Sequence, residues 1–141
     1  MDRIPTDSVS VLLVCPEGLM QKSLITAVNA VPLAHIVGRA VNADSALRQA
    51  QKLSPDVLLA DANPLKDELL SLLKKSKENC PKMFCIVVTV SAFTMQNLPF
   101  LHAGADFILD DKNLDQELTQ IFRNIQAFQK NRPSIEPDDK K

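Results

Sequence analysis

Apolar residues along the chain form short continuous runs, separated by longer stretches in which they recur every three or four positions. The runs are rich in Val, Ile and Leu, and most are bounded by polar residues or proline. This pattern is typical of strands that are buried on both faces of a parallel sheet. It predicts five strands, at Val9–Val14, His35–Val41, Val57–Ala60, Phe84–Val90 and Phe107–Leu109.

The stretches between these runs have the helical spacing that gives each segment one apolar face. They predict helices over Leu19–Val31, Ala46–Leu53, Leu65–Lys77, Thr94–Ala103 and Leu114–Phe128. Asn42 or Asp44 is the expected N-cap of the second helix. Gly104 is expected to end the fourth helix in a left-handed backbone conformation.

Strand and helix therefore alternate five times, which predicts an α/β fold with a doubly wound, five-stranded parallel sheet. We expect residues 1–8 to be an N-terminal extension and residues 9–130 to form one domain. Residues 131–141 contain two prolines and almost no apolar side chain, so we expect a flexible tail or linker there.

Composition excludes several classes of function. The 141 residues carry 16 basic and 17 acidic side chains, so nothing indicates direct nucleic-acid binding. The basic run Lys74–Lys77 is expected to be a solvated helix face. No apolar run is long enough to span a membrane, and no export signal is present, which predicts a cytoplasmic protein without membrane contact. Three cysteines cannot all pair, and we expect buried, reduced thiols.

Polar and unusual residues follow the predicted strands. Because the carboxyl ends of parallel strands meet at one edge of the sheet, these residues are expected to lie close together. They are Cys15-Pro16-Glu17 after the first strand, Asp61 after the third, Ser91 after the fourth and Asp110-Asp111 after the fifth.

The spacing of these motifs resembles the receiver domain of two-component response regulators, from about Val9 to Phe128. PDVLLAD ends in Asp61 and is similar to the phosphoacceptor strand, Ser91-Ala92 is similar to the hydroxyl–small pair, and GADFIL begins at Gly104. The branch with helix-turn-helix output domains is most similar, through VLLV…GL and GAD. The resemblance implies a flavodoxin-like (βα)5 receiver fold with strand order 2-1-3-4-5.

Several positions depart from the pattern that the resemblance implies. Receivers use two carboxylates after the first strand, which hold Mg²⁺ together with the phosphoacceptor, and here Cys15 and Pro16 replace them. A thiol is a poor Mg²⁺ ligand and proline has no side-chain donor atom. Glu17 lies beyond this pair. Asp111 stands where receivers have a lysine that pairs with the phosphoryl group, and the adjacent Lys112 is expected to point the other way along a strand.

The aromatic switch position of receivers is Ile108 here, with Phe107 beside it on the opposite side of the strand. Two other interpretations of the strand ends are weaker. A redox role for Cys15 would need a positive neighbourhood, and nearby acids favour inert packing instead. A hydrolase triad of Ser91, His102 and Asp61 lacks the nucleophile elbow.

The sequence therefore predicts a degenerate receiver, or pseudo-receiver, that acts through protein–protein contacts and is independent of phosphorylation. We expect no enzymatic activity, no cofactor and no metal. The expected partner is a signalling protein or output domain, and a homodimer is an option, with Leu98, Phe100 and Phe128 on the contact surface. Two alternatives stay open: a phosphorylatable receiver that uses Asp61, with Glu17 replacing the acidic pair, or the detached regulatory domain of a DNA-binding transcription regulator.

Overall fold

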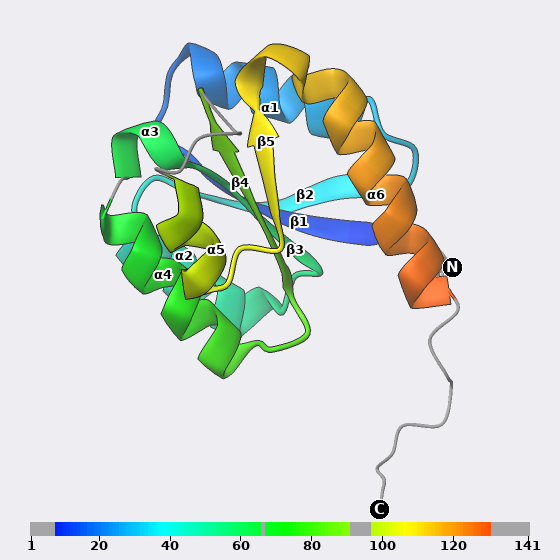
Figure 1. The fold of residues 1–141 in the computed structure, drawn as a ribbon. Coiled ribbons are helices and arrows are strands. Elements are labelled where there is room, and N and C mark those ends of the chain that lie inside the picture. The colour runs from blue at the N-terminus through cyan, green and yellow to red at the C-terminus, as the bar shows by residue number, and fades with distance from the viewer. Residues whose placement is uncertain (1–7, 66, 91–96, 131–141) are drawn as a thin grey trace, which may run out of the picture.

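A computed structural model describes residues 8–65, 67–90 and 97–130 (Figure 1). Its centre is a five-stranded sheet in which every strand pair is parallel, with the order β2-β1-β3-β4-β5. The strands are β1 (Val9–Val14), β2 (Ala34–Ala40), β3 (Val57–Asp61), β4 (Phe84–Thr89) and β5 (Phe107–Asp110). The predicted fold class and strand order are both confirmed.

Helices cover both faces of this sheet (Figure 1). One face packs against α1 and α6, and the other packs against α2, α3, α4 and α5. The helices are α1 (Leu19–Asn29), α2 (Ala43–Leu53), α3 (Ala62–Leu65), α4 (Asp67–Asn79), α5 (Leu98–Ala103) and α6 (Leu114–Lys130), with a 3-10 turn η2 (Asp111–Asn113) before α6. No described helix is both long and apolar enough to cross a membrane.

The strands divide the core into two halves, because alternate side chains point to opposite faces of a sheet. On β1, Leu13 packs into the half beneath α1 and α6, while Leu12 packs into the half beneath α2 and α4. Both leucines are fully buried. The continuous apolar runs in the sequence are the consequence of this burial on both faces.

Several predicted boundaries differ from the structure. The helix predicted over Leu65–Lys77 corresponds to α4, and the short helix α3, which begins directly after Asp61, was not predicted. Strand β2 ends at Ala40, one residue before the predicted end, and β4 ends at Thr89. Of the predicted fourth helix, the described part begins at Leu98, and residues 94–96 lie outside the described residues.

The predicted end signals are confirmed at two positions. Asn42 is the N-cap of α2, where its side-chain oxygen accepts a hydrogen bond from the Ser45 amide at 2.9 Å. Gly104 follows α5 with φ 126°, in the left-handed region that favours glycine. A Cβ at Gly104 would lie 2.7 Å from Cγ of Lys77, so the glycine also gives room to that side chain.

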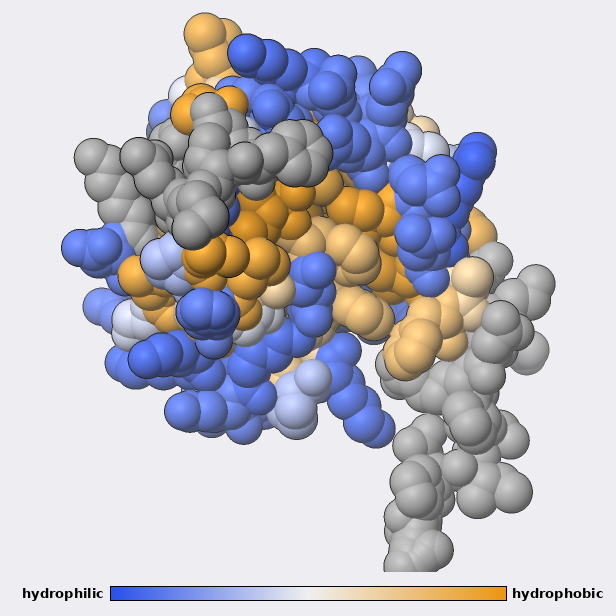
Figure 2. Space-filling model, viewed as in Figure 1, coloured by the Kyte–Doolittle hydropathy of each residue, from blue (hydrophilic) through white to orange (hydrophobic). Residues whose placement is uncertain are grey.

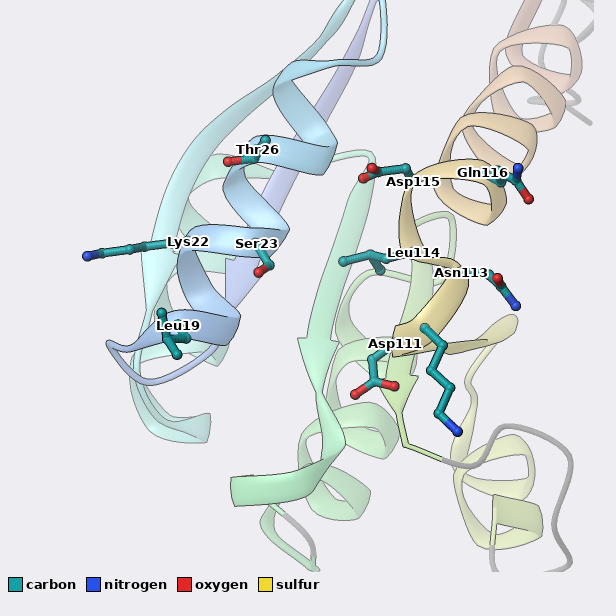
Figure 3. A pocket seen from close by; sticks show the side chains of 10 residues that line it. Leu19, Lys22, Ser23, Thr26, Asp111, Asn113, Leu114, Asp115 and Gln116 are labelled. Atoms are coloured by element: carbon teal, nitrogen blue, oxygen red, sulfur yellow. The ribbon is translucent and has the colours of Figure 1, made fainter.

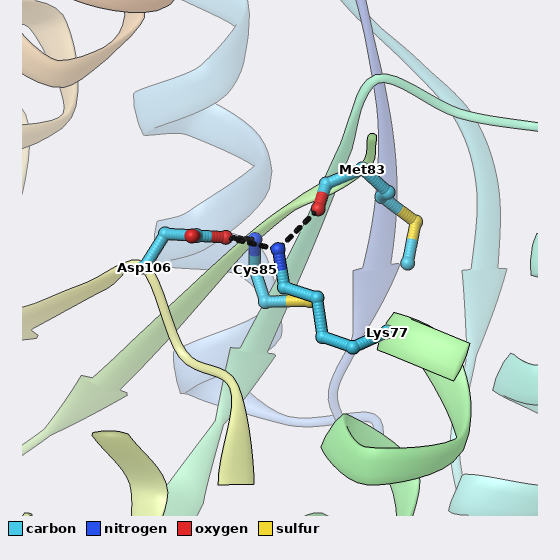
Figure 4. A network of polar contacts seen from close by, with 4 residues as sticks. All are labelled: Lys77, Met83, Cys85 and Asp106. Carbon is cyan, nitrogen blue, oxygen red and sulfur yellow. Dashed lines mark hydrogen bonds and ion pairs between the residues drawn. The ribbon is translucent and has the colours of Figure 1, made fainter. Parts of the chain in front are cut away.

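Lys77 links α4 to the sheet, a role that differs from its predicted place on a solvated face. Its Nζ lies 2.7 Å from Asp106 Oδ2 and donates to the Met83 carbonyl at 2.8 Å (Figure 4). The same Asp106 oxygen accepts from the Cys85 amide at 2.8 Å. Lys74 and Lys75 are exposed as predicted. Lys77 thereby fixes the C-terminal half of α4 against the start of β4 and the residue before β5.

Candidate functional site

The site lies at the carboxyl ends of the strands, where β1 and β3 are neighbours. Val14 is paired with Ala60, so the next residues, Cys15 and Asp61, lie side by side at the edge of the sheet. The Cys15 thiol donates to the Asp61 carboxylate, with 3.8 Å between Sγ and Oδ2. Cys15 is 1% exposed and Asp61 is 4% exposed. The structure therefore brings together two of the residues that the sequence singled out.

The surroundings of Cys15 keep its thiol protonated. Burial, followed by the negative charge of Asp61 and the hydrogen bond to it, raises the pKa of the Cys15 thiol from 9.0 to about 12. The Cys15 carbonyl also accepts from Gln21 Nε2 at 3.0 Å, which ties the end of β1 to α1. At neutral pH the thiol is a neutral hydrogen-bond donor and a weak nucleophile, as the sequence predicted.

The donor atoms at the end of β1 do not fit Mg²⁺. This ion requires several oxygen ligands in octahedral geometry. Cys15 offers a protonated sulfur, Pro16 has no donor atom in its side chain, and Glu17 is exposed. Within the described ranges, no group of three or more His, Cys, Asp or Glu side chains is arranged to hold a metal ion. Asp61 makes at least one further interaction besides the thiol contact.

A pair of carboxylates occupies the end of β5. Strand β5 ends at Asp110, whose Oδ1 accepts from the Lys112 amide at 3.0 Å and caps the turn η2. Burial, followed by the hydrogen bond with Asp110 and the charge of Asp110, raises the pKa of the Asp111 carboxyl group. Lys112 belongs to this 3-10 turn and not to the strand, so the predicted strand alternation does not apply to it.

A groove of about 600 Å³ lies beside Asp111, between α1 and the start of α6. Figure 3 shows that Leu114 and the Asp115 carboxylate point towards α1, whereas Lys22 on α1 points away from the groove. Asp111 and Asp115 line this groove together with Lys22 and Lys112, so the lining carries both signs of charge. The acid closest to the end of β5 is Asp111, at the position where receivers have a lysine.

The end of β4 differs from the prediction. Ser91, the predicted hydroxyl residue, lies outside the described residues. The last residue of β4 is Thr89, which is 7% exposed and is paired with Asp110 on β5. The predicted strand extended to Val90, one residue beyond the end of β4. The assignment of Ser91 as the hydroxyl residue therefore stays a prediction, and Thr89 is a second hydroxyl residue at this strand end that the sequence reasoning did not single out.

The aromatic and aliphatic residues of β5 face opposite ways, as predicted. Phe107 packs against the half of the core beneath α1 and α6, and Ile108 packs against the other half. Phe107 also contacts Phe84, with 6.5 Å between the ring centroids. The position that resembles the receiver switch aromatic is therefore an aliphatic residue directed towards α4 and α5.

Comparison with protein-family profiles finds no match, and no curated protein sequence matches the chain. Solved structures do match. A two-component response regulator of the LuxR family from Aurantimonas sp. SI85-9A1 has a TM-score of 0.76 at 18% identity, covering 93% of this chain and 91% of its own. The signal receiver domain of the response regulator NarL from Mycobacterium tuberculosis has a TM-score of 0.75 at 16% identity, covering 85% and 97%.

The response regulator domain of CheB from Thermotoga maritima has a TM-score of 0.71 at 20% identity, covering 89% of this chain and 99% of its own. These neighbours are matched over nearly their whole length, and the shared feature is the arrangement of strands and helices. Matches at such low sequence identity show a shared fold only. The function of the residues at the strand ends has to be argued from their own chemistry. The resemblance that the sequence motifs indicated is confirmed, and the chain has the fold of a response-regulator receiver domain.

Proposed function

We propose that this chain is a pseudo-receiver, a receiver-like signal-transduction module that works through protein–protein contacts without being phosphorylated. The observation that carries the proposal is the buried contact between Cys15 and Asp61. In a receiver, the residue at the position that corresponds to Cys15 helps to hold the cation on which phosphorylation depends. Here a protonated thiol takes that place, and its pKa of about 12 keeps it a donor to the carboxylate.

The charge balance at the strand ends supports the same proposal. Phosphoryl transfer requires cationic groups to stabilise the negative charge that develops in the transition state. Asp111 occupies the position of the receiver lysine, and a second acid, Asp110, is hydrogen-bonded to it. Replacing a cation by an anion at this position reverses the sign of the interaction with a phosphoryl group. The proposal accordingly includes no enzymatic activity, no metal and no cofactor.

The proposed contact surface consists of Leu98 and Leu101 on α5, Phe107 on β5 and Phe128 on α6. Leu98, Leu101 and Phe128 are exposed by 39, 45 and 56%, whereas Phe107 is half-buried. Figure 2 shows apolar residues gathered between α5 and α6 on this side of the molecule. Exposed apolar surface of this kind favours a protein partner, such as a signalling protein, an output domain or a second copy of the chain. Phe100, predicted on this surface, is half-buried.

Beryllofluoride, which mimics a phosphoryl group on aspartate, tests the central claim. We expect amide signals of the ¹⁵N-labelled chain to be unchanged when beryllofluoride and Mg²⁺ are added, and to be equally unchanged in Asp61→Asn. A receiver that uses Asp61 would instead show shifts around β3 and β4 that Asp61→Asn abolishes. That outcome would replace the proposal by the phosphorylatable alternative.

A second experiment addresses the contact surface. Isolation of the protein from cells, with Leu101→Asp as the comparison, should recover a protein partner that the variant loses. DNA recovered with the chain in place of a protein would favour the alternative of a detached regulatory domain of a DNA-binding regulator. A cytoplasmic location is part of the proposal, because cytoplasmic partners are expected.

A further inference from the structure

A groove of about 840 Å³ lies between α4 and α5, on the face of the sheet that these two helices cover. The two helices lie side by side there (Figure 1). Leu70 on α4 and Pro99 and Ala103 on α5 supply apolar lining. Most of the charged lining comes from α4, which contributes Asp67, Lys74, Lys75 and Glu78, while α5 contributes His102.

The charges on this face of α4 are separated by sign along the helix. Asp67 lies in the first turn, whereas Lys74 and Lys75 follow two turns later, and all three side chains are exposed. A helix rises about 1.5 Å per residue, so roughly 11 Å or more separates the acid from the lysines along the axis. Within the described residues, none of these three side chains makes an ion pair or a hydrogen bond. The face therefore carries opposite charges that α4 does not neutralise itself.

We infer that this groove binds α4 of a second copy of the chain, in a two-fold symmetric dimer in which the two α4 helices are antiparallel. A two-fold axis near Ser71 places Asp67 of each chain beside Lys74 and Lys75 of the other, so the same contact forms twice. The small side chain of Ser71 at the crossing point lets the helices approach to the usual distance of about 8–10 Å. Glu78 lies past the start of the second helix in this arrangement.

A second copy fits the groove because the charge pattern of α4 is complementary to its own reverse. Opposite charges at the edge of an interface favour the encounter and fix the register. Leu70 and Pro99 lie next to these charges and supply apolar surface that the second helix covers. The contact involves one pair of helices with the short α5, so the buried area is small and we expect a weak dimer.

This groove is separate from the proposed contact surface, which consists of Leu98, Leu101, Phe107 and Phe128. The dimer goes beyond the proposed function, because its formation requires neither a protein partner at that surface nor any particular state of Asp61. It can be measured with the purified chain alone.

Sedimentation velocity over a range of concentrations tests the dimer. We expect the mass of the wild-type chain to rise from 15.6 kDa towards twice that value with concentration, and the dimer to weaken with added salt. Asp67→Lys should raise the dissociation constant by about tenfold or more, because attraction becomes repulsion at two symmetric positions. The double variant Lys74→Glu, Lys75→Glu should have the same effect. The substituted side chains are exposed, and thermal unfolding verifies that each variant is folded.

Mixing the two variants is the decisive measurement, because both contacts of the mixed dimer again join opposite charges. Fluorescently labelled Asp67→Lys should therefore sediment as a dimer when unlabelled Lys74→Glu, Lys75→Glu is added. Lys22→Glu, Lys52→Glu is the matched control. It changes the net charge equally at two exposed lysines outside the groove, and it should not recruit the labelled chain.

Three outcomes would overturn the inference. The first is a wild-type chain that remains monomeric up to about 1 mM. The second is a dimer that keeps its dissociation constant when Asp67 or the two lysines are reversed. The third is a dimer that only Leu101→Asp abolishes, because the proposed contact surface would then be the interface. None of these outcomes changes what the beryllofluoride experiment shows about Asp61.

Discussion

The Cys15 thiol and the Asp61 carboxylate are joined by a hydrogen bond between neighbouring strands, with 3.8 Å from Sγ to Oδ2. Both side chains are almost fully buried, and the thiol is the donor because its pKa is about 12. An S–H group is a weak donor, so the bond partly satisfies a carboxylate that receivers direct towards a metal ion. The two side chains therefore form a hydrogen-bonded pair at the end of β1 and β3.

A double-mutant cycle measures how strongly the two side chains interact. Cys15→Ala and Asp61→Asn should show a coupling of about 0.5–1 kcal/mol in the free energy of unfolding, the lower part of the range for hydrogen bonds. Denaturant unfolding at pH 7 provides the measurement. In the control cycle, Cys85→Ala replaces Cys15→Ala. Cys85 is equally buried, but it is paired with Leu58, three residues before Asp61 on β3, so its effects should add to those of Asp61→Asn.

Thiol reactivity should separate the three cysteines. Burial is the main cause that raises the pKa of Cys15 and of Cys85 from 9.0 to about 12. A rise of this size lowers the thiolate fraction at pH 8 by roughly a thousandfold. Iodoacetamide should therefore modify Cys80, which is half-buried, before the other two, as peptide mass spectrometry can follow. Early modification of Cys15 in the folded chain would show that its thiol is accessible and activated, against the inert role assigned to it.

The carboxylate pair at the end of β5 should make stability depend on pH. The folded-state pKa of Asp111 is raised, so the native chain binds more protons than the unfolded chain above the usual pKa of aspartate. The stability that the protonated Asp111 carboxyl group contributes is therefore lost as the pH rises from the usual pKa of aspartate through the raised pKa of Asp111. Asp111→Asn removes the titrating group, and its gain in unfolding free energy should be larger at pH 7 than at pH 4, by less than about 1 kcal/mol for this half-buried group.

Asp2→Asn is the charge-matched control for this measurement, because it removes one acid far along the chain from β5. Its effect should be similar at the two pH values. A gain for Asp111→Asn that is larger at pH 4 would mean that Asp111 is held ionised by a cation in the folded chain.

Much of the fold could be predicted because buried strands and buried helix faces require apolar residues at regular positions in the sequence. Strand β1 begins and ends at the predicted residues, because an apolar run followed by Cys15-Pro16 indicates a buried strand that ends before the proline. The short helix α3 could not be predicted, because the apolar spacing of Leu65, Leu69 and Leu72 begins only at its last residue. All three leucines are buried on the same side of the sheet, so the pattern records their burial and not where a helix begins.

At the site, sequence reasoning identified residue types but not their contacts. Cys15 and Asp61 were both singled out, but the hydrogen bond between them depends on the register of β1 and β3. The role of Lys77 was missed for a similar reason, because Asp106 is 29 residues away along the chain. Local charge runs indicate solvent exposure, whereas an ion pair between distant elements requires the tertiary fold.

Restoring the missing groups should recover a cation-dependent site. In the variant Cys15→Asp, Pro16→Asp, Asp111→Lys, two new carboxylates join Asp61 and a lysine replaces the acid at the end of β5. The side chain at position 15 already lies next to Asp61, so an aspartate there is placed to share a metal ion with it. Without Mg²⁺ the variant should be less stable than wild type, because buried like charges repel one another.

Mg²⁺ should reverse part of that loss, by about 1.4 kcal/mol when the ion is tenfold above its dissociation constant, because it binds the folded state preferentially. Thermal unfolding with and without Mg²⁺ measures this, and adding Asp61→Asn to the triple variant provides the control that should lose the response. Beryllofluoride should then shift amide signals near β3 in the triple variant alone. A folded triple variant that ignores both Mg²⁺ and beryllofluoride would mean that residues 15, 61 and 111 do not converge on one ligand, and the interpretation of Cys15 as a replaced metal ligand would be wrong.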